Sequence, residues 1–583
     1  MSKNKKLAFG VGLVCFVIVV AVAGYALSEH AGAGAQGEGD AEEAATQEAV
    51  VGTQVGALEL ACEAEMAGEE VEAIQDWIYA SVYDEDAQAA VASELEAAKS
   101  GQTLAEPLVR YNPFGTNTQA LYVYFATEQA ASVAYTVSVS DEEAVGIADE
   151  SFVDGSIDDF THSVDDGALV QEHEFQAMGL IPNVVNTVTI TATYEDGTAE
   201  CCVITCDVGD VLGDEELQLE VTEGTSSAEL EDGLYVILGN DSTDADFMYY
   251  YDNRGILRGE VPVIGYRSHR MLFDDEGTMY YSASQSRMVA MNTLGQITHV
   301  YYLGDYDLHH DYVWGADGQL LVLATDTSRD DSDEDLVISL DVETGEVAEL
   351  VDMGDLLATY KEEAFAYHEA NYEPEEGEEE EDDVAGWMHV NSIQYIADED
   401  AMLLSSRETS TIFKISGATS GQPAIEYMLA SELFWEGTEY EGYLFEQVGD
   451  FTVHGGQHCL IYVEDDSLEE GQYYLQFYNN NLGVSASTTN DFDYAGAGIG
   501  GEDASSYYYV YLVDENERTF ELVDSLEVPY SGYVSSVQWV GDNLIIDSGT
   551  LGYYTEYDAG YEPICSFSMG TDKFIYRVFK YDL

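Results

Sequence analysis

Positively charged residues are scarce in this sequence. Its 583 residues include 18 lysines and arginines against 114 aspartates and glutamates, a formal net charge of −96. A nucleic acid is itself a polyanion, and a chain of this charge would repel it. The composition therefore excludes nucleic acid as a partner.

Cysteine is also rare, and its spacing excludes a zinc site of the usual kind. Three of the 7 cysteines, Cys201, Cys202 and Cys206, cluster on one strand-like segment, whereas Cys459 and Cys565 are isolated. None of these spacings resembles a zinc-binding pattern. A disulfide stays open if the chain is exported, but the sequence does not give its pairing.

Proline is the third scarce residue. There are 8 prolines against 53 glycines and 43 tyrosines, and 46% of the residues are hydrophobic. Tyrosine-rich segments separated by glycine-containing turns favour β structure. A chain of this length and hydrophobic content predicts two or more domains with sizeable cores.

The N-terminus combines a basic tip with a long apolar run. Lys3, Lys5 and Lys6 precede an apolar segment at residues 7–27, which is long enough to span a bilayer. The lysines predict that the tip stays cytoplasmic and that residues 1–27 anchor the chain. A cleaved signal peptide is the alternative. Both interpretations place the body outside the cytoplasm, on the membrane or released as a secreted or periplasmic protein.

The next segments predict a spacer, a helical region and a small domain. Residues 28–57 are rich in Gly, Ala, Glu and Gln and read as a disordered linker. Residues 58–105 carry apolar residues three and four apart, which predicts helices. Residues 106–222 contain alternating strands, one pair joined at Asp196-Gly197, and predict a β-sandwich. An acidic link is expected at residues 216–232.

Residues 232–583 predict a β-propeller, so the fold class is all-β. Short apolar strands recur with turns such as Asp275-Glu276-Gly277 and Glu343-Thr344-Gly345. Six blades of roughly 55–60 residues fit this length. The terminal strand at residues 574–581 is expected to close the ring beside the first blade. An acidic insertion at residues 360–383 predicts a solvated loop, with calcium binding as the alternative.

Histidines in three separated stretches and an arginine in a fourth point to one site. His458 follows Gly455-Gly456, His310 follows His309, and His389 and Arg407 lie between them in the sequence. A propeller brings its inner strands together around a central channel, so these residues can meet there. Histidines, an arginine and a carboxamide suit an oxyanion such as sulfate.

Two further candidates stay open at this stage. Arg267 and His269 would share one strand face and could line the same funnel, or could lie on a blade edge. Cys459 beside His458 suggests a nucleophile, but neighbours on a strand point to opposite faces. If His458 faces the cavity, we expect Cys459 to face the core.

Several motifs resemble the bacterial arylsulfate sulfotransferase family. The most specific are the block from Trp387 to Asn391 and the block from Ser405 to Thr409, supported by those from Leu308 to Tyr312 and from Gly455 to His458. Residues 112–115 and 173–183 resemble the N-terminal sandwich domain of that family. The resemblance covers residues 105–583.

The resemblance implies a fold, an activity and roles for named residues. His458 matches the histidine that becomes transiently sulfated, and the neighbouring roles are implied for His310 and His309 near the sulfuryl group, for His389, Asn391 and Arg407 on its oxygens, and for Ser535 as a hydroxyl contributor. The implied fold is a six-bladed propeller behind a β-sandwich. The implied reaction moves a sulfuryl group from an aryl sulfate to a phenol by a ping-pong path without a nucleotide donor, a cofactor or a metal. Some family members are dimers, so a homodimer is expected as one possible state.

Two other functions remain open on the sequence alone. A propeller could serve as a non-catalytic binding or adhesion protein, because fold does not fix function. If water rather than a phenol received the sulfuryl group, the protein would be a hydrolase. The combination of His310, His389, Asn391, Arg407 and His458 favours the transferase.

Overall fold

One long strand organises the N-terminal domain of the computed structural model. The structure describes residues 18–20, 50–140, 157–164, 167–213, 215–240, 246–371, 386–482, 504–571 and 573–583. The first half of β4 (Leu121–Val139) pairs with β3 and β6, and its second half pairs with β5 and β7. The other strands are β2 (Val50–Cys62), β3 (Leu108–Tyr111), β5 (Phe160–Val164), β6 (Val170–Ala177), β7 (Val185–Tyr194) and β8 (Ala199–Val208). The predicted β domain ahead of the propeller is confirmed.

The predicted linker and the start of the helical region are wrong for residues 50–62. These residues form β2, which pairs in parallel with β8. Leu58, Leu60 and Cys62 alternate along the strand and pack on the domain core, but surrounding Gly, Ala and Glu residues hide this period in the sequence. Helices follow only afterwards, as α1 (Val71–Trp77), the π-helix η1 (Ile78–Val82) and α2 (Glu85–Ala98).

The predicted membrane segment lies mostly outside the described residues. Of residues 7–27 the structure describes only β1 (Ile18–Val20), which pairs with the start of β2. Within the described ranges, no helix has the length and apolarity needed to cross a bilayer. The part of the predicted linker at residues 28–49 also lies outside the description.

Six sheets form the propeller, as predicted; four of them have four strands and the last two have five. Their strands are β10 (Leu234–Asn240), β11 (Phe247–Tyr251) and β12 (Leu257–Pro262) in the first blade; β13 (Leu272–Phe273), β14 (Met279–Ser284), β15 (Arg287–Met291) and β16 (Ile297–Tyr302) in the second; and β17 (Tyr306–Trp314), β18 (Gln319–Asp326), β19 (Leu336–Asp341) and β20 (Val347–Asp352) in the third. Most of these strands are buried on both faces because neighbouring blades cover them.

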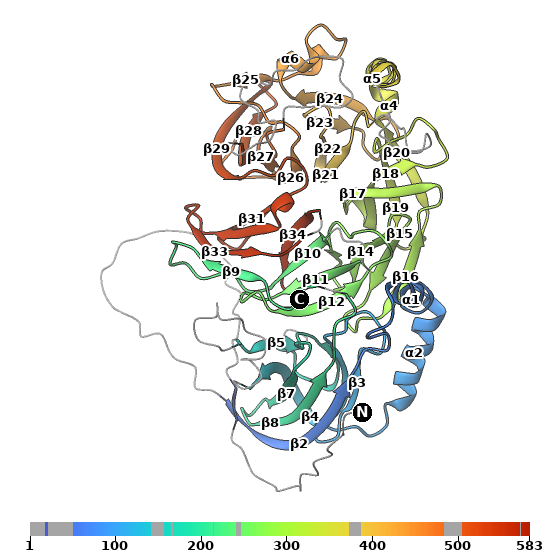
Figure 1. Ribbon diagram of the computed structural model, residues 1–583, viewed down its shortest axis with the longest axis vertical. Helices are drawn as coiled ribbons and strands as arrows, with labels where there is room; N and C mark the ends of the chain where they lie inside the picture. The colour runs from blue at the N-terminus through green and yellow to red at the C-terminus, as the bar shows by residue number, and fades with distance from the viewer. Residues whose placement is uncertain are drawn as a thin grey trace, which may run out of the picture.

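The second half of the ring repeats this plan. Its strands are β21 (Val390–Ile396), β22 (Ala401–Ser406), β23 (Thr411–Ser416) and β24 (Ala424–Leu429) in the fourth blade; β25 (Glu446–Val448), β26 (His458–Val463), β27 (Gln472–Asn479), β28 (Ser505–Asp514) and β29 (Thr519–Pro529) in the fifth; and β30 (Ser536–Val540), β31 (Asn543–Ser548), β32 (Tyr553–Tyr557) and β33 (Pro563–Ser568) in the sixth. Short helices α4 (Met353–Leu356), α5 (Ala358–Asn371) and α6 (Glu432–Trp435) lie at the outer end of the propeller (Figure 1).

The acidic insertion begins as a helix rather than a loop. Residues 360–371 belong to α5, so the loop prediction is wrong for that part. Residues 372–385 lie outside the described residues, and the prediction for them stays a prediction.

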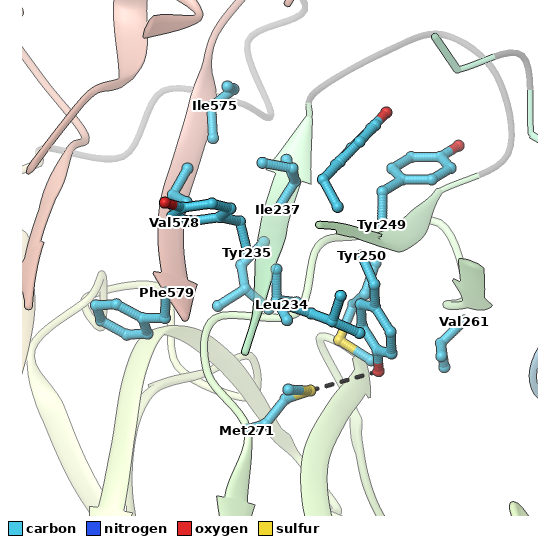
Figure 2. Packing of buried hydrophobic residues seen from close by; sticks show 14 of the residues in the cluster. Leu234, Tyr235, Ile237, Tyr249, Tyr250, Val261, Met271, Ile575, Val578 and Phe579 are labelled. Carbon is cyan, nitrogen blue, oxygen red and sulfur yellow. Dashed lines mark hydrogen bonds between the residues drawn. The ribbon is translucent and has the colours of Figure 1, made fainter. Parts of the chain in front are cut away.

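The ring closes through strands from both ends of the domain. The C-terminal strand β34 (Ile575–Tyr581) pairs with β10 as the innermost strand of the first blade, which confirms the predicted closure. Figure 2 shows Ile575, Val578 and Phe579 of β34 packed with β10 and β11 in the largest core cluster. The prediction of an acidic link at residues 216–232 is wrong for residues 220–223. These residues form β9 (Glu220–Glu223), which is the fifth strand of the last blade.

The N-terminal domain lies beside the first two blades (Figure 1), and buried polar contacts hold it there. The Glu260 carboxylate on β12 accepts hydrogen bonds from the Thr118 hydroxyl and from the backbone N–H groups of Leu212 and Gly213. On α2, the Gln88 amide donates to the Phe114 carbonyl and accepts from the Ile297 N–H. The two domains therefore share a buried polar interface as well as apolar contacts.

Candidate functional site

The structure places the predicted site residues on the inner strands of blades three to six or directly beside them. His309 and His310 lie on β17, His389 directly precedes β21, and Asn391 lies on β21. The turn after β22 carries Arg407, whose backbone N–H donates to the His389 carbonyl at 3.1 Å. His458 begins β26, and Ser535 directly precedes β30.

Backbone bulges turn these residues out of regular strand geometry. The pairing register shifts between Leu308 and Tyr312, and again between His458 and Ile461. His310 and His389 adopt φ values of 55° and 49°, a region that non-glycine residues rarely occupy. Bulges of this kind change the direction of side chains. Backbone strain is also found most often at functional sites.

His458 is held in one tautomer. Its Nδ1 lies 2.9 Å from the Gly456 carbonyl and 2.7 Å from Asn480 Oδ1. The Asn480 amide nitrogen donates to the carbonyls of Ser531 and Val534, which fixes the amide with its oxygen toward His458. Because both partners of Nδ1 are acceptors, Nδ1 carries the proton and Nε2 carries the lone pair.

The environment of His458 also keeps its imidazole neutral. Burial lowers its pKa well below the usual range, the Asn480 hydrogen bond opposes this, and the charges of His389, Arg407 and His310 lower it further. A neutral imidazole with a free Nε2 is the form that can attack an electrophile. The same charges show that the four side chains share one electrostatic environment.

Glu334 joins two of the predicted histidines and was not anticipated. It lies between β18 and β19; its Oε1 is 3.0 Å from His310 Nε2, and its Oε2 forms a close ion-pair contact with His389 Nδ1. The imidazole rings of His310 and His389 are 4.4 Å apart. Burial raises the pKa of Glu334, but the charges of the two histidines outweigh it and hold that pKa well below its usual range.

His309 and His310 are buried imidazoles with low proton affinity. Burial lowers the pKa of each to about 4, although the Glu334 charge opposes the shift. Their rings lie 5.1 Å apart, and His309, His310 and Glu334 bring one possible metal-ligand atom each within 4.8 Å of one another. Among the described residues, this is the group of His, Cys, Asp and Glu side chains that could hold a metal ion.

Arg267 and His269 lie beside the cluster rather than on a blade edge. The His269 ring is 6.4 Å from that of His310 and packs edge-on against Tyr576. The Arg267 guanidinium lies over the rings of Tyr266 and Tyr576, at 4.8 and 5.0 Å. Its positive charge lowers the pKa of both histidines.

Arg407 and Asn391 supply polar groups at the fourth blade. The Arg407 guanidinium donates to the Glu408 carboxylate while its side chain remains 29% exposed. The Asn391 amide nitrogen donates to the Gln457 carbonyl at 2.8 Å, and its Oδ1 has no hydrogen-bond partner in the described part of the chain. This contact ties β21 to the residue that precedes His458.

Ser535 and Cys459 make structural contacts within the propeller. The Ser535 hydroxyl donates to Ser531 at 2.9 Å and accepts from the Gly549 N–H. Cys459 is fully buried in the core, and its thiol donates to the Val537 carbonyl. Burial raises the pKa of that thiol, which disfavours the thiolate needed for nucleophilic attack. All six cysteines in the described ranges are free.

An ion network centred on the buried Asp311 lies next to these residues. Asp311 on β17 accepts from Arg577 on β34 at 2.8 Å and forms an ion pair with Arg270 at 3.1 Å. Its other oxygen accepts from the Ser392 hydroxyl and the Ile393 N–H. Arg577 also donates to the Asn391 carbonyl, so the last strand of the chain supports the site residues of the fourth blade.

Sequence reasoning missed Glu334, Asn480 and the partners of Asp311. Glu334 lies in the acidic run from Asp330 to Asp335, where a solvated surface is the ordinary expectation. Asn480 lies in the run Asn479-Asn480-Asn481, and three adjacent carboxamides at a strand end were a usable signal. Asp311 directly follows His310 in a motif that had been identified, but its partner Arg577 is 266 residues away.

Two family models match the chain. The model described as Arylsulfotransferase (ASST) matches residues 220–577, and the model described as Arylsulfotransferase Ig-like domain matches residues 108–208. The first match covers the propeller from β9 to β34. The second covers the β domain from β3 to the end of β8.

Two solved structures illustrate a distant similarity. A putative 6-phosphogluconolactonase from Bacteroides fragilis shares 11% identity over 68% of this chain and 94% of that chain, with a TM-score of 0.32. The WD40 domain of coronin from Toxoplasma gondii shares 8% identity over 60% and 76%, with a TM-score of 0.29. Similarity at such low identity and TM-score does not indicate a function. No protein with a curated description matches this chain.

Proposed function

The chain belongs to the arylsulfotransferase family, and from this premise we propose that it moves a sulfuryl group from an aryl sulfate ester to a phenol through a sulfated His458. The observation that supports this proposal most strongly is the tautomer of His458. Its Nδ1 is held by Asn480 and Gly456, so the lone pair resides on Nε2 of a neutral, buried imidazole.

In the first step, His458 Nε2 attacks sulfur and the bond from sulfur to the aryl oxygen breaks. The departing phenolate takes a proton from His310 or His389, whose rings lie next to each other and whose shared contact with the Glu334 carboxylate favours the protonated form. In the second step, the acceptor phenol gives its proton back to that histidine while its oxygen attacks sulfur, and the bond between nitrogen and sulfur breaks. A covalent intermediate divides one difficult transfer into two easier ones.

Charge on the sulfuryl oxygens requires hydrogen-bond donors. Arg407, whose guanidinium is partly exposed beside His389, and Asn391, whose amide faces the residue before His458, support this role. We propose no nucleotide sulfate donor and no cofactor, because an aryl sulfate carries its own leaving group.

Intact mass measurement tests the proposal directly. The purified chain is mixed with 4-nitrophenyl sulfate without an acceptor, beside the variant His458→Ala. We expect wild type alone to gain one sulfuryl group, about 80 Da, with a stoichiometric burst of nitrophenol. Peptide mapping then locates the adduct, and addition of phenol removes it.

Each contrary outcome has a definite meaning. Absence of both adduct and nitrophenol from wild type, across several salt concentrations, would favour a non-catalytic binding propeller. Steady release of free sulfate without a phenol would favour a hydrolase. An adduct in His458→Ala would move the nucleophile to another residue.

We also propose that the domains work outside the cytoplasm, anchored by residues 7–27 or released after cleavage. The lysines at the N-terminal tip and the length of the apolar run support export. Cell fractionation with N-terminal sequencing distinguishes an anchored chain from a processed one. A soluble cytoplasmic protein that retains Met1 would contradict both forms.

A further inference from the structure

Two buried histidines and a carboxylate form a donor set that the proposed transfer does not explain. His309 and His310 are 4% and 7% exposed. The His309 ring contacts the Ala324 backbone and the His310 ring contacts the Glu334 carboxylate, so within the described part of the chain each ring keeps a second nitrogen without a partner. A buried polar group without a partner costs free energy, and a missing ion or water is one of the ordinary reasons for finding one.

The distance between His310 and Glu334 also suits two ligands of one metal ion. His310 Nε2 and Glu334 Oε1 are 3.0 Å apart. Two atoms that bind one tetrahedral Zn²⁺ at about 2.0–2.2 Å lie about 3–3.6 Å from each other. His309 brings a third donor atom within 4.8 Å of both.

The backbone holds this donor set in place. Glu334 donates its N–H to the Thr325 hydroxyl at 2.8 Å, and its carbonyl accepts from the Val390 N–H at 3.0 Å. Its second carboxylate oxygen is oriented by His389. Outer partners of this kind fix a ligand for a metal. The Glu334 side chain is 22% exposed, so an ion can reach the cluster from solvent.

We propose that His309, His310 and Glu334 bind one Zn²⁺ ion and that this ion inhibits sulfuryl transfer. Two imidazoles and one carboxylate are a zinc donor set that leaves a fourth position open. The ion occupies the His310 side chain, which the proposed transfer also needs, so ion and substrate compete for it. Zinc binding stands by itself, whereas the inhibition rests on the proposed function.

Equilibrium dialysis of the untagged full chain against Zn²⁺ and a competing chelator tests the site. We expect one tightly held ion per chain in wild type, and at least about 100-fold weaker binding in His309→Ala and in Glu334→Gln. His299→Ala is the matched control, because His299 is an exposed histidine of β16 and should leave the affinity unchanged. Surface carboxylates contribute only weak sites that excess Ca²⁺ displaces.

X-ray absorption at the zinc edge of wild type keeps the test independent of variant folding. We expect two imidazole nitrogens and at least one carboxylate oxygen around the ion. Failure of wild type to retain stoichiometric zinc, or equal affinity in His309→Ala with an intact thermal transition, would overturn the site.

The proposed inhibition by Zn²⁺ is tested by measuring sulfuryl transfer from the aryl sulfate to a phenol. We expect Zn²⁺ to raise the KM for the aryl sulfate in wild type, with full recovery on addition of EDTA. Stoichiometric binding without any loss of transfer would overturn the inhibitory part. If wild type never forms the His458 adduct, the proposed function fails while the dialysis and absorption results still decide the zinc site.

Discussion

At the residue scale, the site stores backbone strain at several of its working positions. His310, His389 and Glu334 all adopt positive φ values, and Ser535 does so at 89°. Each such residue costs on the order of 1–3 kcal/mol, which the surrounding structure must offset. Here the offset comes from buried neighbours such as Tyr576, whose hydroxyl donates to the His310 carbonyl. The strain therefore lies where side chains must converge.

The first prediction concerns the residue that sets the tautomer of His458. Replacing Asn480 with alanine removes one of two acceptors on Nδ1, and we expect kcat/KM to fall about 10- to 100-fold, as for one lost positioning hydrogen bond. Asn480→Asp should raise the pKa of His458, because a carboxylate favours the imidazolium. The acid limb of the pH–rate profile should then move to higher pH.

The control for this prediction is Asn481→Gly. Asn481 is adjacent, has a φ of 55° that glycine tolerates, and donates to the Ser505 carbonyl rather than to His458. Its pH profile should match wild type. An unchanged acid limb in Asn480→Asp, with the sulfated intermediate still forming, would refute the positioning role while leaving the transferase proposal intact.

The second prediction concerns the buried charge of Asp311. Asp311→Asn keeps the shape but leaves Arg270 and Arg577 without their counter-charge, so we expect a loss of about 3–5 kcal/mol in the free energy of unfolding. Urea titration measures it. Asp307→Asn is the matched change on the same strand, where the side chain is half-buried and makes no ion pair in the described structure. Equal losses in the two variants would contradict the network's importance.

At the scale of secondary-structure elements, strands with a regular apolar pattern were predictable from the sequence, whereas bulges and strands without such a pattern were not. The strands of the propeller and the closing strand β34 follow from apolar runs and turn residues. β2 was missed because its apolar residues alternate within a small-residue segment. Residues 121–139 form the single long strand β4, in which the residues between Ala126 and Ala131 bulge instead of turning. Such choices depend on partners that a local pattern does not reveal.

The third prediction concerns Glu260 of β12, at the interface between the domains, and the way its contribution to stability depends on pH. Burial raises the pKa of Glu260 to about 7, its hydrogen bonds oppose the shift, and the Asp210 charge adds to it. A raised carboxyl pKa means that the folded state binds the extra proton. This contribution to stability is full below about pH 4.5, falls as pH rises toward 7, and is lost above that.

Thermal unfolding across pH 4.5–8 in wild type and Glu260→Gln checks this expectation. The glutamine cannot ionise, so the difference between the two unfolding midpoints should change over this range and then level off. The absolute stability of the variant is less informative, because its amide also meets the Gly213 N–H. A constant difference across the whole range would show that Glu260 does not titrate near 7.

At the scale of the whole molecule, a strongly negative exterior surrounds a site rich in cations. The formal net charge is −96, whereas Arg267, Arg270, Arg407 and Arg577 all lie around the channel. The exterior repels an anionic aryl sulfate at long range, and the arginines attract it only nearby. Salt screens the long-range part first, because it acts through solvent.

We therefore expect added salt to favour the donor. Raising the ionic strength from about 0.01 to 0.3 M shortens the Debye length several-fold, so the KM for the aryl sulfate should fall while kcat stays nearly constant. The neutral phenol acceptor is the internal control, and its KM should change much less. A donor KM that rises with salt would mean that the arginines dominate at all distances.

The sequence by itself determined the all-β propeller, the β domain before it and the family, because strand periodicity and short motifs are local properties. It also named His310, His389, Arg407 and His458, which the structure brings into one environment. Only the tertiary structure decided which groups hold them. Glu334, Asn480 and Arg577 reach the site through ring closure and bulged strands, and contacts across as many as 266 residues leave no local pattern to detect.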